Sequence, residues 1–191
     1  MLSAHRSALR QFDRRVQLVS DQQWGNSTPD PDWTVRDLVS HLVVEQLWVP
    51  PLLAGKTIQD VGDQFDGDIL GEDPKGAWTA AAATARAALE EPGAIDRTVH
   101  LSFGTVPVPV YLGQMTLDLT VHAWDLAKGI NADDEMPNDL VSTVLADAQR
   151  TADQWQDSGL FAAAIPVPGC TDDLTELLAL TGRPRWWTRP A

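Results

Sequence analysis

Apolar residues recur every three or four positions along most of the chain, a spacing that predicts amphipathic helices. The predicted helices cover residues 3–20, 34–50, 74–89, 110–128, 137–158 and 172–181. Alternating apolar residues over 97–103, followed by Gly104, Pro107 and Pro109, predict at most a short strand or extended segment near 97–108. The pattern therefore predicts an all-α fold, an antiparallel four-helix bundle with short satellite helices.

The segments between the predicted helices contain residues that predict loops, helix ends and helix caps. Residues 56–73 contain many aspartates and few large apolar groups, so we expect a long surface loop there. The Pro50-Pro51 pair is expected to stop or kink the second helix. Asp73 is expected to cap the third helix, because a proline follows it at the first helical position.

Composition narrows the class of protein. The 191 residues predict a single domain over 1–191, in which 160–191 is a C-terminal extension packed on the bundle. A net charge of −13 would repel nucleic acid and anionic lipid, so we expect neither as a partner. The sequence shows neither a signal peptide nor a membrane-length apolar run, which predicts a cytoplasmic protein. Its single cysteine, Cys170, excludes an internal disulfide and is interpreted as a passive thiol.

Two predicted helices carry polar side chains on the face that their apolar pattern turns inward. On the helix over 34–50, His41 and Glu45 lie within about a quarter turn of the core face. The helix over 110–128 carries a polar stripe made of Tyr111, Gln114, Asp118, His122 and Asp125. The opposite face of that helix is small and neutral, which leaves open whether the stripe is buried.

Asp118 and His122 are four residues apart on one helix, so their side chains could share one metal ion. His41, on a neighbouring antiparallel helix, could supply a third ligand. Three protein ligands leave an open coordination position, which is typical of catalytic metal sites. The alternative is a buried, hydrogen-bonded Asp–His pair that binds no metal.

Three segments of the chain resemble a known family. Residues 32–42 (Asp-Trp-Thr-Val-Arg-Asp-Leu-Val-Ser-His-Leu) and 117–127 (Leu-Asp-Leu-Thr-Val-His-Ala-Trp-Asp-Leu-Ala) resemble the two metal motifs of the DinB-like family that includes mycothiol-dependent maleylpyruvate isomerase. Residues 180–184 (Leu-Thr-Gly-Arg-Pro) resemble the tail of its single-domain members. The resemblance implies a four-helix bundle that holds a divalent metal, usually zinc with nickel or iron as alternatives. Its ligands would be His41, Asp118 and His122.

The chain also departs from the isomerase of this family. That enzyme has glutamate where this chain has Asp118, a shorter carboxylate that can still bind a metal with a different reach. It also has an additional C-terminal domain, for which the roughly 30 residues after Gly159 are too few. What the resemblance implies is therefore the property shared more broadly, a metal that binds and activates a low-molecular-weight thiol such as mycothiol.

Three functions follow as hypotheses. The resemblance implies a metal-dependent thiol transferase or isomerase whose partners are a small thiol and a small electrophilic substrate. The first alternative is a metal-dependent hydrolase that uses metal-bound water, with Glu45 or Asp125 as its base. The second is a non-catalytic, metal-stabilised module that binds a small molecule or a protein. Outside the hydrolase hypothesis, Glu45 is interpreted as a carboxylate that orients a ligand histidine or lies at the edge of a groove. Asp125 is interpreted as a local cap or pairing partner, with support of His122 as the alternative. A helix-face homodimer is compatible with such a fold. The sequence assigns no catalytic or thiol-binding residue.

Overall fold

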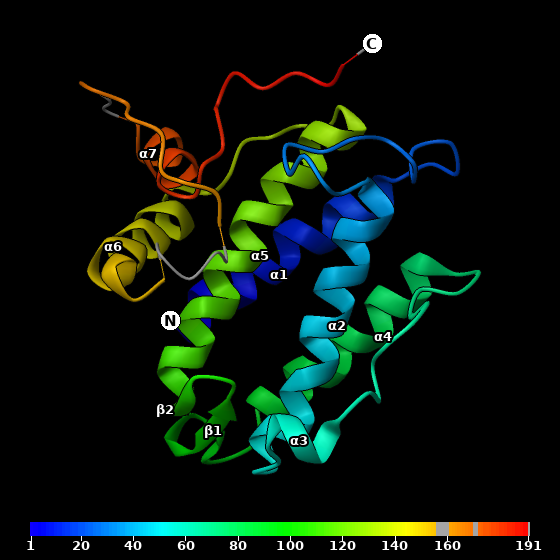
Figure 1. The fold of residues 1–191 in the computed structure, drawn as a ribbon, viewed down its shortest axis with the longest axis vertical. Helices are drawn as coiled ribbons and strands as arrows, with labels where there is room; N and C mark the ends of the chain where they lie inside the picture. The colour runs from blue at the N-terminus through cyan, green and yellow to red at the C-terminus, as the bar shows by residue number, and fades with distance from the viewer. Residues whose placement is uncertain (156–160, 170–171, 191) are drawn as a thin grey trace. The chain divides into compact units, whose positions relative to one another are not determined.

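The structure, a computed structural model, describes residues 1–155, 161–169 and 172–190, without the side chains of residues 153–155. The described residues form seven α-helices, one 3-10 helix and one two-stranded sheet (Figure 1). The helices are α1 (Leu2–Leu18), α2 (Val35–Leu53), α3 (Ile58–Val61), α4 (Pro74–Leu89), α5 (Val108–Ile130), α6 (Asn138–Trp155) and α7 (Asp173–Leu180). The 3-10 helix is η1 (Ala94–Asp96), and the strands are β1 (Thr98–Leu101) and β2 (Gly104–Pro107). The predicted all-α class with a short extended segment near 97–108 is confirmed.

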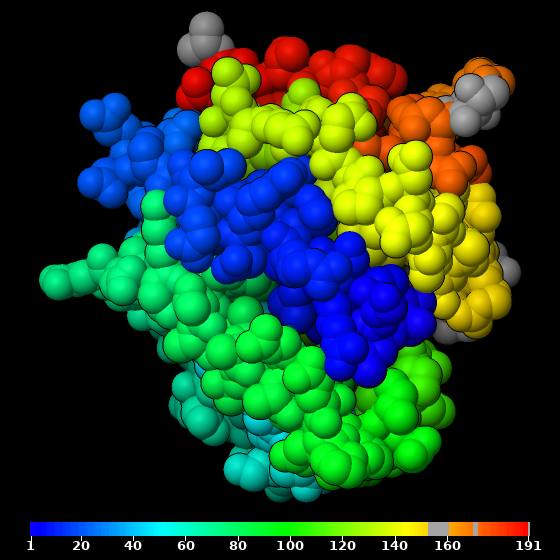
Figure 2. All heavy atoms as spheres, turned by 180° about the vertical axis from the view of Figure 1, so that it is seen from behind, coloured from blue at the N-terminus to red at the C-terminus, as the bar shows by residue number. Residues whose placement is uncertain are grey.

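Contacts within the chain divide it into two compact units. Unit 1 comprises Met1–Val35 and Thr116–Ala191, and unit 2 comprises Arg36–Met115. Within unit 1, α6 packs against α1 and α7, and Figure 2 shows α1 in dark blue beside α6 in yellow. The single domain over 1–191 stays a prediction. Of the predicted extension over 160–191, the described helix α7 packs on α6.

α1 shows how the sequence pattern becomes a core. Ala8, Phe12 and Val16 follow one another at four-residue spacing, so they share one face of the helix, and all three are fully buried. In the part of the chain that the structure describes, no helix combines the length and the apolar character needed to cross a bilayer.

α2 continues through the Pro50–Pro51 pair, where the sequence predicted a stop or a kink. Neither proline has an N–H to donate. Their carbonyls nevertheless accept hydrogen bonds from the N–H groups of Ala54 and Lys56, each at 3.0 Å. Because the pair lies in the last turn, the helix includes both prolines and ends at Leu53.

Side-chain caps begin two helices of unit 2. The Asp73 carboxylate accepts a hydrogen bond from the N–H of Gly76 at 2.9 Å, which confirms the predicted cap of α4. α3 was not predicted, since a four-residue helix is too short to show a periodic pattern. It begins with a capping box, in which Thr57 accepts from the N–H of Asp60 and the Asp60 carboxylate accepts from the N–H of Thr57.

The extended segment of unit 2 is a hairpin rather than a single strand. β1 pairs antiparallel with β2, and the register runs from Thr98 opposite Pro107 to Leu101 opposite Gly104. Pro107 breaks the strand pattern in the sequence, but the last residue of an edge strand tolerates a proline. Gly104 has a φ of +139°, a conformation that favours glycine where the chain turns.

The segment between α1 and α2 docks on the C-terminal end of α5, within unit 1. The Gln23 side-chain amide donates to the carbonyl of Ile130 and the Asn26 amide to the carbonyl of Gly129, both at 2.9 Å. These are carbonyls that a helix end leaves without partners inside the helix. Gly129 permits the close approach, because a Cβ there would lie 2.9 Å from Cγ2 of Val35 and 3.3 Å from the carbonyl oxygen of Ser27.

We expect Gly129→Ala to destabilise the protein. Alanine usually stabilises a helix relative to glycine by about 1 kcal/mol. Here its Cβ would collide with the buried, stiff side chain of Val35, and such overpacking costs about 1–3 kcal/mol. Urea unfolding should therefore show a lower midpoint for this variant. Gly25→Ala is the control, since no atom lies within 4 Å of its added Cβ. A midpoint for Gly129→Ala at or above that of the parent protein would contradict this packing.

Candidate metal centre

α5 presents the predicted polar stripe from a largely buried helix. Between residues 111 and 130 only Gln114, Asp118 and Lys128 are partly exposed, and the others are buried. A helix that is buried on all sides needs partners for its polar side chains. Burial of the stripe, which the sequence left open, is thereby established for His122 and Asp125.

Asp118 and His122 form the pair that the four-residue spacing predicted. Nε2 of His122 lies 3.3 Å from Oδ1 of Asp118, one helical turn away. The His122 side chain is 4% exposed, whereas that of Asp118 is 22% exposed. The pair therefore combines a buried imidazole with a carboxylate that solvent can reach.

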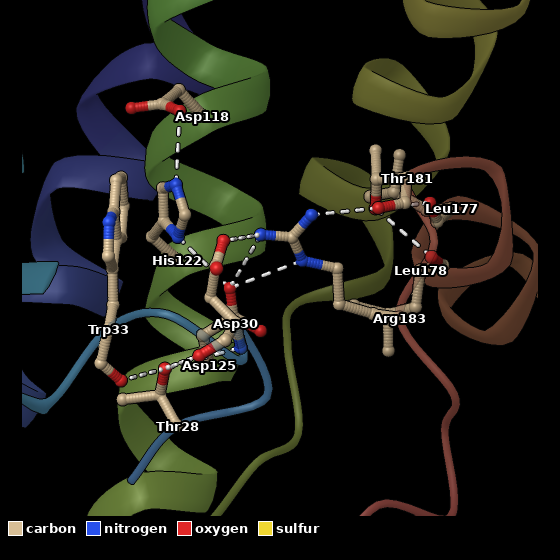
Figure 3. A network of polar contacts seen from close by, with 10 residues as sticks. All are labelled: Thr28, Asp30, Trp33, Asp118, His122, Asp125, Leu177, Leu178, Thr181 and Arg183. Carbon is tan, nitrogen blue, oxygen red and sulfur yellow. Dashed lines mark hydrogen bonds and ion pairs between the residues drawn. The ribbon is translucent and has the colours of Figure 1, made fainter. Parts of the chain in front are cut away.

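The second ring nitrogen of His122 contacts a different carboxylate. Nδ1 lies 3.0 Å from Oδ2 of Asp125, which is fully buried (Figure 3). An ionised carboxylate can only accept, so Nδ1 is the donor in this hydrogen bond. The indole ring of Trp33 packs beside the imidazole, with ring centroids 5.3 Å apart and planes tilted by 33°. Asp125 and Trp33 therefore fix the ring with Nε2 toward Asp118.

The segment between α1 and α2 folds into a tight turn that presents Trp33. The buried Thr28 side chain donates to the carbonyl of Trp33 at 2.9 Å. The backbone N–H of Thr28 also donates to that carbonyl at 3.3 Å, and the N–H of Val35 donates to the carbonyl of Asn26 at 2.9 Å. These hydrogen bonds join the two ends of the segment 26–35, so local backbone structure fixes the position of Trp33.

Asp125 also contacts a cation from the far end of the chain. Nη2 of Arg183 lies 3.3 Å from Oδ2 of Asp125 and 3.0 Å from Oδ2 of Asp30. Arg183 is itself buried, and Figure 3 shows its guanidinium pointing at both carboxylates. The two buried charges thus compensate each other, as buried charges must.

Two opposing effects set the pKa of His122. Burial alone would lower it, but the charges and hydrogen bonds of Asp118, and after it those of Asp125, raise it from 6.5 to about 9. His5 on α1 is the contrast. It is also buried, its Nδ1 lies 3.4 Å from Oγ1 of Thr116, and burial lowers its pKa to about 4.

Other residues singled out in the sequence lie elsewhere. His41 and Glu45 are half-buried side chains of α2, in unit 2. Their roles as a third metal ligand and as a base or orienting carboxylate stay predictions. Cys170 lies outside the described residues.

Sequence reasoning missed Arg183 and Asp30 as members of this cluster. Arg183 stands 58 positions from Asp125 and 153 positions from Asp30. No local spacing rule connects residues so far apart. The available signal was the position of Arg183 directly after Gly182, at the predicted end of a helix.

One surface groove of unit 1 lies apart from this cluster. It has a volume of about 460 Å³ and is lined by residues around the starts of α6 and α7, four of which are acidic: Glu135, Asp139, Asp172 and Asp173. An acidic lining disfavours an anionic ligand such as a thiolate. The candidate metal centre is therefore the side-chain cluster and not this groove.

Comparison with known proteins places the chain in a family. Residues 5–127 match the family described as the mycothiol maleylpyruvate isomerase N-terminal domain. Two proteins of Mycobacterium tuberculosis are each 31% identical over 184 residues: the uncharacterized proteins MT0763 (strain CDC 1551 / Oshkosh) and Rv0738 (strain ATCC 25618 / H37Rv). The match covers 95% of this chain and 97% of each relative.

Solved structures show the same fold. Crystal structures of the mycothiol-dependent maleylpyruvate isomerase and of a mutant of it match with a TM-score of 0.62. The identities are 19% and 18%, and the match covers 86% of this chain and 72% of those chains. Fold and site thus define a DinB-like helical protein with a paired histidine and aspartate. The chain belongs to the mycothiol maleylpyruvate isomerase N-terminal domain family.

The opposite pKa shifts of the two buried histidines predict opposite pH dependences in the metal-free protein. Because the pKa of His122 is raised to about 9, its protonation contributes stability that is fully present below pH 6.5 and lost as the pH rises to about 9. Because the pKa of His5 is lowered to about 4, stability is lost as the pH falls from 6.5 toward 4. NMR titration of the ring protons should show both values.

Asp118→Asn tests the cause of the raised pKa. This variant removes the largest interaction that raises the pKa of His122, so its titration should move to lower pH while that of His5 stays in place. Titration of His122 at or below pH 6.5 in the parent protein would contradict the geometry of the pair.

Proposed function

We propose that this chain is a divalent-metal enzyme that activates a low-molecular-weight thiol, mycothiol or a similar one, for transfer to or isomerisation of a small electrophile. The metal would be zinc, with nickel and iron as alternatives, and its ligands His41, Asp118 and His122. The observation that carries the proposal is the Asp118–His122 pair, with its buried and oriented imidazole, in a chain of this family.

The pair fits such an ion. Ligand atoms about 2.0–2.1 Å from a tetrahedral zinc ion lie about 3.3 Å apart. Nε2 of His122 and Oδ1 of Asp118 are separated by 3.3 Å. Imidazole nitrogen and carboxylate oxygen are donors that suit zinc, nickel and iron. Asp118 reaches this distance although it is shorter than the glutamate expected from the family resemblance.

The residues around the proposed ion would have different roles. A divalent ion with an open coordination position lowers the pKa of a bound thiol and so favours its nucleophilic thiolate. Asp125 would keep the Nδ1 proton on His122, which leaves the Nε2 lone pair for the ion. Trp33 covers one face of the ring, while the partly exposed Asp118 leaves the centre accessible from solvent.

The burial of Asp125 weighs against one form of the hydrolase alternative. A general base must come within hydrogen-bond distance of the water that it activates. Asp125 is fully buried, and its Oδ2 is shared by His122 and Arg183. Glu45 would then have to be the base of such a hydrolase.

Metal content tests the metal centre. Protein purified without added metal should contain close to one equivalent of zinc, nickel or iron, and this metal should be lost in His122→Ala, Asp118→Ala and His41→Ala. His100→Ala is the matched control, since His100 lies on β1 and contacts Thr105. A metal-free parent protein that also fails to take up added zinc would overturn the proposal. Loss of metal in His122→Ala but not in His41→Ala would remove His41 from the ligand set.

Cobalt substitution tests thiol activation. Mycothiol added to the cobalt-loaded protein should produce a sulfur-to-metal charge-transfer band, because a thiolate that binds the ion donates charge to it. The experiment uses Cys170→Ser protein, so that the chain's own thiol cannot give the band. The absence of a band with mycothiol, glutathione and cysteine would overturn thiol activation, and ester or amide hydrolysis would then be tested with Glu45→Gln.

A further inference from the structure

We propose that Arg183 is a positioning residue for His122 and acts through Asp125. Arg183 would hold the carboxylate of Asp125, which in turn keeps the imidazole of His122 in its metal-binding orientation. A residue that follows α7 in the chain would thereby influence the metal affinity of His122 on α5. The inference rests on the proposed metal function. It concerns residues of unit 1 alone: Asp30, His122, Asp125 and Arg183.

The end of α7 places Arg183 by its backbone. The N–H of Arg183 donates to the carbonyl of Leu178 at 2.7 Å, and the N–H of Gly182 donates to that of Ala179 at 3.1 Å. This pair of bonds, with Gly182 at a φ of +77°, is a Schellman cap. A Cβ at Gly182 would lie 2.6 Å from Cβ of Ala162, so the turn requires glycine for space as well as for conformation. The cap thus fixes the point at which the Arg183 side chain leaves the backbone.

The guanidinium is held from several sides. Nη1 donates to the carbonyl of Thr181 at 2.8 Å, and Nη2 donates to Oδ2 of Asp30 at 3.0 Å. Nε and Nη2 lie 3.4 and 3.3 Å from Oδ2 of Asp125, and the group lies 5.5 Å from the centre of the Phe161 ring. A planar group held in this way is a rigid reference for the carboxylate that it contacts.

A single carboxylate oxygen of Asp125 contacts both His122 and Arg183. Oδ2 accepts from Nδ1 of His122 and from Arg183, while the buried Oδ1 has no hydrogen-bond partner among the described residues. A buried carboxylate that loses its cation is strongly destabilised. An imidazole that binds a metal is neutral. When His122 serves as a ligand, Arg183 is therefore the cation that remains beside Asp125.

The consequence for the metal follows from the shared oxygen. Arg183 fixes Oδ2, Oδ2 fixes the Nδ1 side of the ring, and Nε2 then faces Asp118 at 3.3 Å. Without Arg183 the carboxylate can rotate toward other partners, and the ring loses its fixed orientation. Loss of such supporting contacts typically weakens metal affinity by roughly 10- to 100-fold.

Zinc affinity of the full chain tests this inference. Competition with a chromophoric chelator should give roughly 10- to 100-fold weaker zinc binding for Arg183→Met than for the parent protein. Arg185→Met is the matched control. It removes the same charge two residues away, where Arg185 contacts Asp134 and Glu135 instead. The cobalt absorption spectrum of Arg183→Met should also change, which a loss of stability alone would not cause.

A double-mutant cycle covers the case in which Arg183→Met does not fold. The double variant Arg183→Met/Asp125→Asn buries no unpaired charge at this pair, and in Asp125→Asn the guanidinium of Arg183 still keeps Asp30 as its counter-charge. Both variants should bind zinc with the same weakened affinity. Equal affinities for Arg183→Met and Arg185→Met, or a further loss in the double variant, would overturn the action through Asp125 while leaving the metal site in place. A parent protein that binds neither zinc nor cobalt would overturn the proposed function itself, and this inference with it.

Discussion

The buried carboxylate of Asp125 is the constraint on which the candidate site depends. A charge that is fully buried needs a cation and hydrogen-bond donors, and Asp125 obtains them from Arg183 and His122. Three segments of unit 1 meet at this carboxylate: the segment before α2 with Asp30, the middle of α5, and the segment after α7 with Arg183. One electrostatic requirement thus joins segments that lie more than 50 positions apart in the sequence.

The two buried histidines show that charge rather than burial decides the chemistry. His5 is buried with Thr116 as its hydrogen-bonding neighbour, and its pKa falls to about 4. His122 is buried just as deeply, yet Asp118 and Asp125 raise its pKa to about 9. A metal ion would replace the proton on Nε2 of His122, so metal affinity is expected to weaken as the pH falls below that value.

The sequence predicted what depends on local spacing. Helical periodicity predicted the main helices, and the proline after Asp73 predicted the cap of α4. The four-residue interval between Asp118 and His122 predicted their contact. The sequence could not predict α3, whose single turn has no periodicity, or the contact of Arg183 with Asp125, which depends on how distant segments pack. The sequence also left the burial of α5 open, because the small residues on one face of this helix suit both a packed and an exposed surface.

Asp118 and Asp125 show how one residue type takes two roles on one helix. They stand four residues before and three residues after His122, so each lies beside one of its ring nitrogens. Asp118 is partly exposed, and in the proposed centre it would exchange its contact with Nε2 for a metal ion. Asp125 is fully buried and held by Arg183, so its contact with Nδ1 remains when the other is exchanged. Solvent access and the neighbouring cation, rather than the carboxylate itself, therefore suit Asp118 to the proposed role of metal ligand and Asp125 to that of support for His122.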